Sequence, residues 1–278
     1  MFRTRLEPMD EPKTSGPDRW PGGAHSAAAI TFDFDAEEVW IAENPANASR
    51  PGVLSQGTYG ARVGVPLILQ ILERREIHAT FFVPGRVAER YPDVVRAIVS
   101  AGHELAHHGY THTSPTALSP QAEEDELVRG LEILSSFGTP VTGYRSPAWE
   151  FSEQTLALLA KHGFGYSSNL MDDIRPYRHG VSGIVELPVH WTLDDAPHFS
   201  FSGASWTKKI ATVDEVRSIW ADELAGVHRL GGSAILTMHP QVIGRPGRLP
   251  LLEETIEGLQ SRPETFLGTC AQIAACVP

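Results

Sequence analysis

A regular alternation of short β-rich runs with stretches of helical spacing constrains the fold more than any other feature of the chain. Strands that alternate with helices predict a parallel sheet with right-handed crossovers, and seven or eight such units favour an irregular (β/α)7-8 barrel of the α/β class over an open sheet. The expected strands cover residues 28–34, 78–83, 104–108, 142–146, 164–168, 184–189, 233–239 and 265–269. The expected helices cover residues 65–76, 93–102, 120–137, 152–163, 213–229 and 250–261.

The chain is expected to form one domain. Its 278 residues, of which 41% are hydrophobic, supply enough apolar mass for one large core. The segment 1–24 is polar and rich in Pro and Gly, so we expect an N-terminal arm there, followed by a single catalytic barrel over residues 25–278. The stretch between the first strand and residue 65 is rich in Pro, Asn and Gly, which predicts a loop.

Charge and composition argue against two classes of partner. The formal charge of -11 does not suit a nucleic-acid partner, which would require a basic surface. No apolar run approaches the roughly 20 residues that span a bilayer, so no membrane partner is expected. The N-terminal residues lack the apolar core of a secretory signal, and the two cysteines, Cys270 and Cys276, suit neither a disulfide framework nor a zinc knuckle. These features predict a cytoplasmic protein.

Residues 30–38, ITFDFDAEE, set two acids two positions apart at the end of the first expected strand. Side chains at Asp33 and Asp35 therefore point the same way. Two buried and unpaired carboxylates repel each other at considerable cost. Either the strand runs into solvent there, or the acids belong to a site in which a cation removes the repulsion.

Unusual residues end four of the expected strands. Asp33 and Asp35 end the first, His108 and His112 follow the third, Arg145 lies at the end of the fourth, and His239 ends the strand at 233–239. Active groups of parallel barrels lie at the carboxyl ends of the strands, which meet at one rim. We therefore expect an active site there.

The pair His108 and His112 brings both rings to one face if the segment turns helically. With Asp35 the set becomes two nitrogens and one oxygen, a common ligand set for catalytic zinc that leaves a coordination position for water. Cobalt, nickel and iron also accept such a set. A single histidine is more often a surface or hydrogen-bonded core residue, so the combination carries the prediction.

The remaining groups suggest an acid and a base. Asp33 is free to take a proton from water. Arg145 beside it would orient Asp33, and His239 would donate a proton to a leaving nitrogen. The plainer alternatives are a surface cation for Arg145 and a strand cap for His239.

Four segments together resemble the motifs of the polysaccharide deacetylase family, carbohydrate esterase family four. They are TFDFD at 31–35, HGYTH at 108–112, RSPAW at 145–149 and LTMHP at 236–240, in the family's order. The resemblance implies the family's irregular (β/α) barrel. For the chemistry it implies Asp33 as base, Asp35, His108 and His112 as metal ligands, Arg145 as the residue that orients the base, and His239 as acid. For the pocket it implies contributions from Pro147, Trp149 and Leu236.

The family's usual fourth motif, an Asp-containing segment that tunes the acid histidine, has no clean counterpart. Its region holds ELPVHWTLDDAPHF, residues 186–199, which with three further segments resembles a branch that includes Helicobacter-type peptidoglycan deacetylase-like proteins and cyclic imide hydrolases. Members are often cytoplasmic oligomers with enclosed sites, which implies a homo-oligomer here. Tyr59, Arg62 and Asp195 are further candidates for the pocket. Their alternative is a structural role, such as a turn that begins with Asp194 and Asp195.

We therefore expect a metal-dependent hydrolase of non-peptide carbon–nitrogen (amide) bonds, with zinc as the favoured ion and cobalt, nickel or iron as alternatives. A small cytosolic cyclic imide or related amide is the favoured substrate. The resemblance equally suggests an N-acetyl sugar, as for an N-acetylglucosamine or peptidoglycan deacetylase. A third alternative, a non-catalytic barrel that binds a carbohydrate or ureide, requires the loss of a base, ligand or acid position, and all of these are present.

Overall fold

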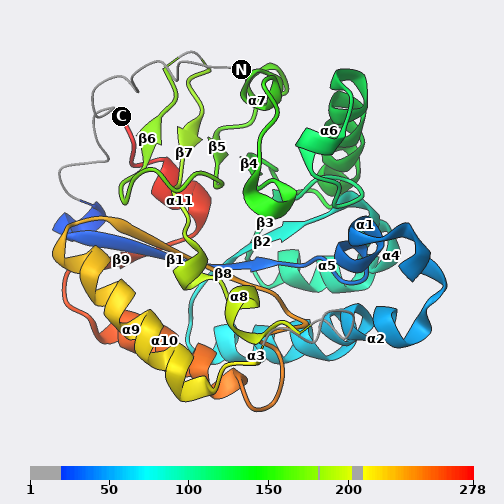
Figure 1. Ribbon diagram of the computed structural model, residues 1–278. Coiled ribbons are helices and arrows are strands. Elements are labelled where there is room, and N and C mark those ends of the chain that lie inside the picture. The colour runs from blue at the N-terminus through cyan, green and yellow to red at the C-terminus, as the bar shows by residue number, and fades with distance from the viewer. Residues whose placement is uncertain (1–19, 181, 202–208) are drawn as a thin grey trace, which may run out of the picture.

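The computed structural model describes residues 20–180, 182–201 and 209–278. Within them one nine-stranded sheet has the order β6-β7-β5-β4-β3-β2-β1-β8, and β9 pairs with β1 (Figure 1). All pairs are parallel except β6 with β7, which confirms the predicted α/β class and adds an antiparallel edge strand that the sequence did not indicate. The strands are β1 (Ser26–Asp33), β2 (Thr80–Val83), β3 (Glu104–His107), β4 (Gly143–Tyr144), β5 (Tyr166–Ser167), β6 (Tyr177–Arg178), β7 (Val185–Glu186), β8 (Ser233–Met238) and β9 (Thr265–Leu267).

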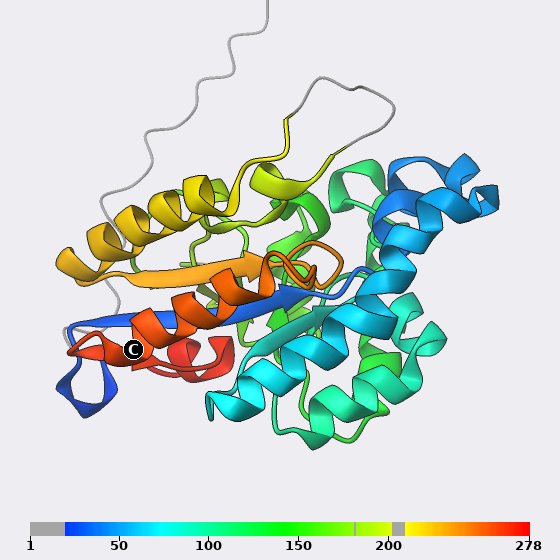
Figure 2. The same ribbon diagram turned by 90° about the horizontal axis from the view of Figure 1, so that it is seen from below.

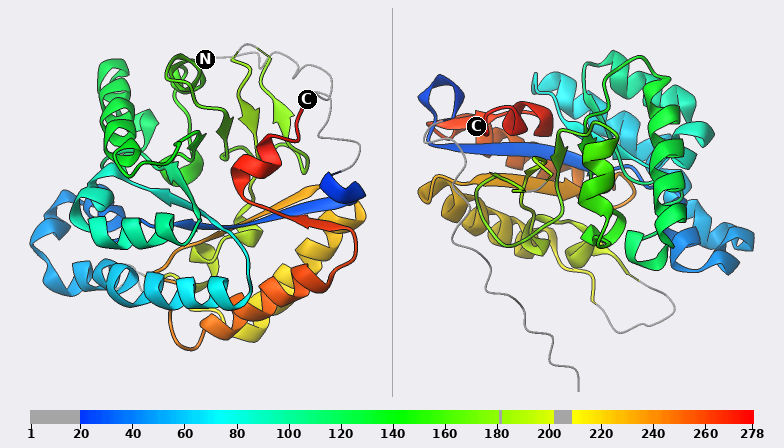
Figure 3. Two further views of the ribbon diagram at one scale, coloured as in Figure 1. Left: turned by 180° about the vertical axis from the view of Figure 1, so that it is seen from behind. Right: turned by 90° about the horizontal axis from the view of Figure 1, so that it is seen from above.

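The sheet curls into an irregular half-barrel (Figure 3). The segment that follows β7 returns to the opposite edge of the sheet, where Asp194 forms a parallel bridge with Thr237 of β8. There the N–H of Asp195 donates to the carbonyl of Thr237 at 3.1 Å. This segment thus joins the two edges near the carboxyl ends of the strands.

β1 forms the middle of the structure and is buried at all eight positions, as expected for a parallel strand covered on both faces. Its residues alternate between two clusters. Ile30 and Phe32 belong to the core under α3, α9 and α10, which lie along one face of β1 and β8 (Figures 1 and 2). The helices are α1 (Glu38–Glu43), α2 (Pro51–Tyr59), α3 (Val65–Arg74), α4 (Gly85–Arg90), α5 (Pro92–Ser100), α6 (Pro120–Ser135), α7 (Thr155–Lys161), α8 (Ala196–Phe199), α9 (Val213–Arg229), α10 (Leu249–Ser261) and α11 (Cys270–Ala274).

The C-terminal helix α11 fills the concave side of the half-barrel. Its residues Cys270 and Ile273 are fully buried and share a cluster with Ala27 and Ala29 of β1. Figure 3 shows α11, in red, on the side of β1 opposite α10. The concave face is therefore packed with apolar side chains below the carboxyl edge, where the site lies.

The predicted loop after the first strand is wrong, because most of this stretch is helical. After α1, the 3-10 turn Pro45–Ser49 leads into α2, which continues through the π-helix Gly60–Gly64 into α3. Its glycines serve close packing: a Cβ on Gly57 would lie 2.4 Å from the carbonyl of Ala36, and one on Gly64 would lie 2.2 Å from the carbonyl oxygen of Pro240. Glycine here lets the helix approach the loops that carry the site.

The predicted division into an arm over 1–24 and a barrel domain over 25–278 stays a prediction, since residues 1–19 lie outside the described part of the chain. In the described ranges, none of the helices combines the length and apolar character that crossing a bilayer requires.

Candidate active site and metal-binding cluster

The predicted site residues meet at the carboxyl edge of the sheet. Asp33 is the last residue of β1, His108 follows β3 directly, Arg145 follows β4, and His239 follows β8. Parallel strands bring these ends together, as the sequence predicted. Asp33, Asp35, His108 and Arg145 are all buried.

Asp35, His108 and His112 form a cluster whose ligand atoms all lie within 4.8 Å of one another. Oδ1 of Asp35 lies 3.4 Å from Nε2 of His108 and 3.6 Å from Nε2 of His112. The other nitrogen of His108, Nδ1, lies 2.8 Å from the carbonyl oxygen of Arg145. A ring that donates its Nδ1–H to a carbonyl presents an unprotonated Nε2, which is the form that binds metal ions.

A turn, and not a helix, brings the two histidine rings together. Gly109 and His112 have φ values of 74° and 59°, and the segment between His108 and His112 has no helical hydrogen bonds. The ring centroids of the two histidines are 5.0 Å apart. The helical geometry considered for this pair is therefore wrong, although the pairing itself is correct.

The residues of this cluster fit a metal ion. Among the described residues, no group donates a hydrogen bond with acceptable geometry to Oδ1 of Asp35, although this oxygen is fully buried. A buried carboxylate oxygen with no donor is costly unless a cation faces it. One carboxylate with two imidazoles is a donor set that suits zinc and several other divalent ions.

The electrostatics of the cluster keep Asp35 ionised and His112 neutral at pH 7, the protonation states in which these side chains bind a metal ion. Burial by itself raises the pKa of Asp35, but the imidazoles of His112, His108 and His239 outweigh it and lower the pKa to about 2. Burial lowers the pKa of His112 to about 4, so this ring is neutral at pH 7. For His108 the attraction of Asp33 and Asp35 exceeds the opposing effect of burial and raises the pKa.

Arg145 clamps Asp33 in one orientation. Its Nη1 donates to Oδ1 of Asp33 at 2.7 Å and to the hydroxyl of Thr31 at 2.8 Å. Nη2 donates to the hydroxyl of Ser168 at 3.0 Å, and the guanidinium carbon lies 4.0 Å from the ring centroid of Phe82. The alternative of a surface cation is wrong, because Arg145 is fully buried. Sequence reasoning did not identify Thr31 or Ser168 as partners.

His239 is held by a buried carboxylate. Its Nδ1 lies 2.6 Å from Oδ1 of Asp195, and its main-chain N–H donates to Oδ2 at 3.0 Å. Burial opposes the charged ring, but Asp195, with smaller contributions from Asp194 and Asp35, raises the pKa of His239 well above the usual value. The sequence placed Asp195 in the substrate pocket; in the structure it is fully buried behind His239, in contact with both the ring and the backbone.

The other pocket candidates are distributed around the rim. Tyr59 donates its hydroxyl proton to the carbonyl of Gly244 at 2.8 Å, and Arg62 is exposed on the π-helix. Pro147 is buried after β4. The ring of Trp149 packs against that of Trp191 in a tilted arrangement, with ring centroids 4.3 Å apart; Trp149 is buried and Trp191 is exposed.

Leu236 does not line the pocket as predicted. It is fully buried in the core cluster that also contains Ile30 and Phe32, under the helices. Side chains alternate along β8, so Leu236 and Met238 face the helices and Thr237 faces the concave side with Thr31.

Comparisons with known proteins identify the family of the chain. Residues 57–167 match the sequence profile of a family described as "Polysaccharide deacetylase". The peptidoglycan deacetylase of Helicobacter pylori (strain ATCC 700392 / 26695) is 32% identical over 276 residues, which cover 88% of this chain and 94% of the relative.

Solved structures extend the similarity over nearly the whole chain. A crystal structure from Mycobacterium smegmatis, of a protein assigned to the polysaccharide deacetylases, has a TM-score of 0.91 and 41% identity and covers 96% of this chain and 95% of that one. An allantoinase structure with a TM-score of 0.81 and 22% identity, covering 95% of this chain and 93% of that one, shares the fold. The chain belongs to the polysaccharide deacetylase family, a family of hydrolases that act on amide carbon–nitrogen bonds.

Proposed function

We propose that this protein is a metal-dependent amide hydrolase with Asp33 as base and His239 as acid. The observation that carries the proposal is the placement of these two groups around the cluster. Oδ2 of Asp33 lies 3.9 Å from Nε2 of His108, and Nε2 of His239 lies 3.7 Å from Oδ2 of Asp35. A base and an acid thus adjoin the same cluster from two different strands.

The contacts of each group suit its proposed task. Arg145 occupies Oδ1 of Asp33 and leaves Oδ2 free to accept a proton from the attacking water. Asp195 accepts the Nδ1–H of His239, so that the proton on Nε2 faces the cluster. When the carbon–nitrogen bond breaks, His239 gives this proton to the leaving nitrogen. At the end of the reaction Asp33 has gained one proton and His239 has lost one.

Asp35, His108 and His112 are the proposed metal ligands, with zinc as the proposed ion and cobalt, nickel or iron as alternatives. A divalent ion bound by these residues would polarise the amide carbonyl and lower the pKa of the attacking water.

The proposed substrate is a small cyclic imide or related amide. The low exposure of the site residues supports this: the rings of His112 and His239 are only 12% and 15% exposed, and the carboxylate of Asp35 beside them is 1% exposed. Tyr59, Arg62, Pro147 and Trp149 are the proposed substrate contacts. A second candidate, an N-acetyl sugar, is favoured by the similarity to the Helicobacter pylori peptidoglycan deacetylase.

The substrate also bears on where the protein acts. A small imide suits the cytoplasmic location that we propose, whereas a cell-wall sugar requires export. A homo-oligomer is proposed from the resemblance to the branch described above, and sedimentation velocity would test it.

The test is hydrolysis of succinimide, dihydrouracil, allantoin, a chitooligosaccharide and a muropeptide by wild type and Asp33→Asn. We expect ring opening of an imide by wild type and its loss in the variant. Release of acetate from the sugars alone would assign the second candidate. Turnover of none of the five would contradict a hydrolase of either kind.

A further inference from the structure

The loop that joins His108 to His112 is clamped between two helices. On one side the N–H groups of Gly85 and Arg86, at the start of α4, donate to the carbonyls of Gly109 and Tyr110, both at 3.0 Å. These bonds hold the carbonyl groups of Gly109 and Tyr110 against α4. The N–H groups of Tyr110 and Thr111 point the other way, toward α6.

Glu126 of α6 accepts the donors of this loop. Its Oε2 accepts the N–H of Tyr110 at 3.1 Å and the N–H of Thr111 at 2.8 Å, and its Oε1 accepts the hydroxyl of Thr111 at 2.8 Å. Hydrogen bonds from backbone N–H groups to a carboxylate are stronger than those to a neutral acceptor. One side chain thus binds the two residues that precede His112.

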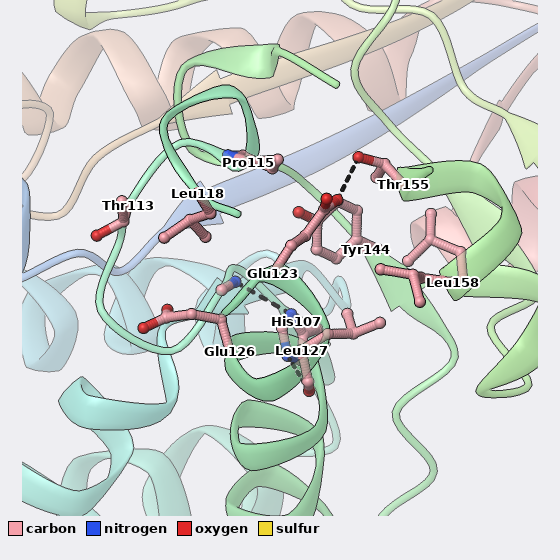
Figure 4. Close-up of a pocket in the computed structure, with 12 residues that line it drawn as sticks. His107, Thr113, Pro115, Leu118, Glu123, Glu126, Leu127, Tyr144, Thr155 and Leu158 are labelled. Carbon is pink, nitrogen blue, oxygen red and sulfur yellow. Dashed lines mark hydrogen bonds between the residues drawn. The ribbon is translucent and has the colours of Figure 1, made fainter. Parts of the chain in front are cut away.

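A close contact between α6 and β3 brings Glu126 to this position. A Cβ on Gly130 would lie 2.4 Å from Nε2 of His107, so α6 reaches the strand only with glycine there. His107 then bridges the two elements: Nε2 lies 3.0 Å from the carbonyl of Leu127, and Nδ1 accepts the N–H of Gly109 at 3.0 Å. Figure 4 shows His107 between α6 and the loop, with Glu126 on the same helix.

The conformation of the loop requires such support. His112 has a φ of 59°, in the left-handed region that a residue with a Cβ adopts only at a cost of about 1 kcal/mol or more. Bonds that fix Tyr110 and Thr111 hold the chain in this turn and so aim the ring of His112 at Asp35.

We propose that Glu126 is a positioning residue that orders the loop for metal binding. The proposal rests on the metal site of the proposed function, and it concerns a residue outside the motifs named above. Glutamine at position 126 would offer one acceptor oxygen where the loop presents three donors. The NH₂ group of this glutamine would face an N–H or O–H donor of the loop. Two donors repel each other, so the loop would move away from the position that His112 needs for metal binding.

Glu123 provides a matched control on the same helix. Its carboxylate is buried and bonds to Ser152, Thr155 and Gln154, and Figure 4 shows it directed at Thr155 while Glu126 points away from this pair. Glu123→Gln therefore disturbs α6 and its contacts with Ser152 and Thr155 without touching the loop.

The test measures zinc and cobalt dissociation constants of metal-stripped wild type, Glu126→Gln and Glu123→Gln by competition with a chelator, alongside urea unfolding of each metal-free protein. We expect Glu126→Gln to raise the dissociation constants about 10- to 100-fold, the range seen when residues that orient metal ligands are substituted. We expect Glu123→Gln to leave them within about twofold. If Glu126→Gln does not fold, Thr111→Val, which removes one of the three bonds, is expected to give a smaller rise in the same direction.

Two outcomes would overturn the proposal. One is equal metal affinity in wild type and Glu126→Gln; the other is an equal loss in both glutamate variants, which a purely structural role of α6 predicts. Absence of metal binding by wild type would overturn both this proposal and the proposed metal site. Tight metal binding that depends on Glu126, in a protein that hydrolyses no amide, would support this proposal and contradict the proposed function.

Discussion

His239 and Asp195 form a hydrogen-bonded pair in which Nδ1 of the ring lies 2.6 Å from Oδ1 of the carboxylate, although the two residues are 44 positions apart. They meet because the segment after β7 pairs with β8 through Asp194 and Thr237. Burial by itself would lower the pKa of His239, but the hydrogen bond and charge of Asp195, together with the charges of Asp194 and Asp35, outweigh burial and raise the pKa. The ring therefore keeps its proton to a higher pH than a free histidine.

Asp195→Asn is expected to move the alkaline limb of the kcat/KM profile to lower pH. The acid must be protonated to act, and a raised pKa extends the protonated form upward in pH, so removal of the carboxylate charge shortens the active range from the alkaline side. Profiles of wild type, Asp195→Asn and Asp194→Asn check this. Asp194, whose Oδ1 is 3.7 Å from the ring nitrogen, should give a smaller shift. An unchanged alkaline limb in Asp195→Asn would argue against His239 as the acid.

Substitutions of Asp33 and Asp35 are expected to have different effects on metal binding and turnover. Asp33→Asn should keep the metal content of wild type and lose about 10²- to 10⁴-fold in kcat, as expected on loss of a general base. Asp35→Asn should lose metal as well as turnover, because it removes one of three protein ligands. Elemental analysis of the dialysed proteins, read with kcat, distinguishes these cases. Loss of metal from both variants, or from neither, would contradict the assignment.

Arg145→Lys is expected to lower kcat/KM by about 10²-fold. Without the clamp Asp33 would shift, and a displacement of a catalytic group by about 1 Å has an effect of this size. Lysine cannot bond Asp33, Thr31 and Ser168 from one planar group, and the buried oxygens left without donors should lower the free energy of unfolding by about 1–3 kcal/mol. The control is Arg217→Lys, at exposed ion pairs with Asp214 and Glu254, where both kcat/KM and the free energy of unfolding should stay close to the wild-type values. Urea unfolding and steady-state kinetics measure the two effects.

Gly57→Ala is expected to lower the free energy of unfolding by about 1–3 kcal/mol, because the new methyl group would meet the backbone of Ala36 at 2.4 Å. Gly52→Ala, in the same helix with no heavy atom within 4 Å of the new Cβ, should be neutral or stabilising by up to about 1 kcal/mol. Thermal and urea unfolding of the two variants provide the comparison. Equal stability of both variants would show that α2 does not pack as described.

The site was predictable where each residue lies at the end of a parallel strand. Asp33, His108, Arg145 and His239 lie at the ends of four strands whose carboxyl ends share one edge, so strand order alone brings them together. The same reasoning, applied to side-chain alternation, would have placed Leu236 with the core, since it lies on the opposite face of β8 from Thr237.

Other features had no local signal in the sequence. Proline and glycine in residues 45–64 indicated a loop. In the structure Gly57 and Gly64 allow close contacts with Ala36 and Pro240, and both partners lie far from these glycines in the sequence. The role of Asp195 depends on a pairing across the edges of the sheet. The contact of Glu126 with the histidine loop depends on how closely α6 approaches β3.

The most direct test of the central claim is amide hydrolysis by metal-stripped protein before and after reloading with zinc. We predict that stripping abolishes turnover and that about one ion per chain restores it, as a site with three protein ligands requires. Full activity of the stripped protein, with no metal in elemental analysis, would contradict metal-dependent hydrolysis at Asp35, His108 and His112.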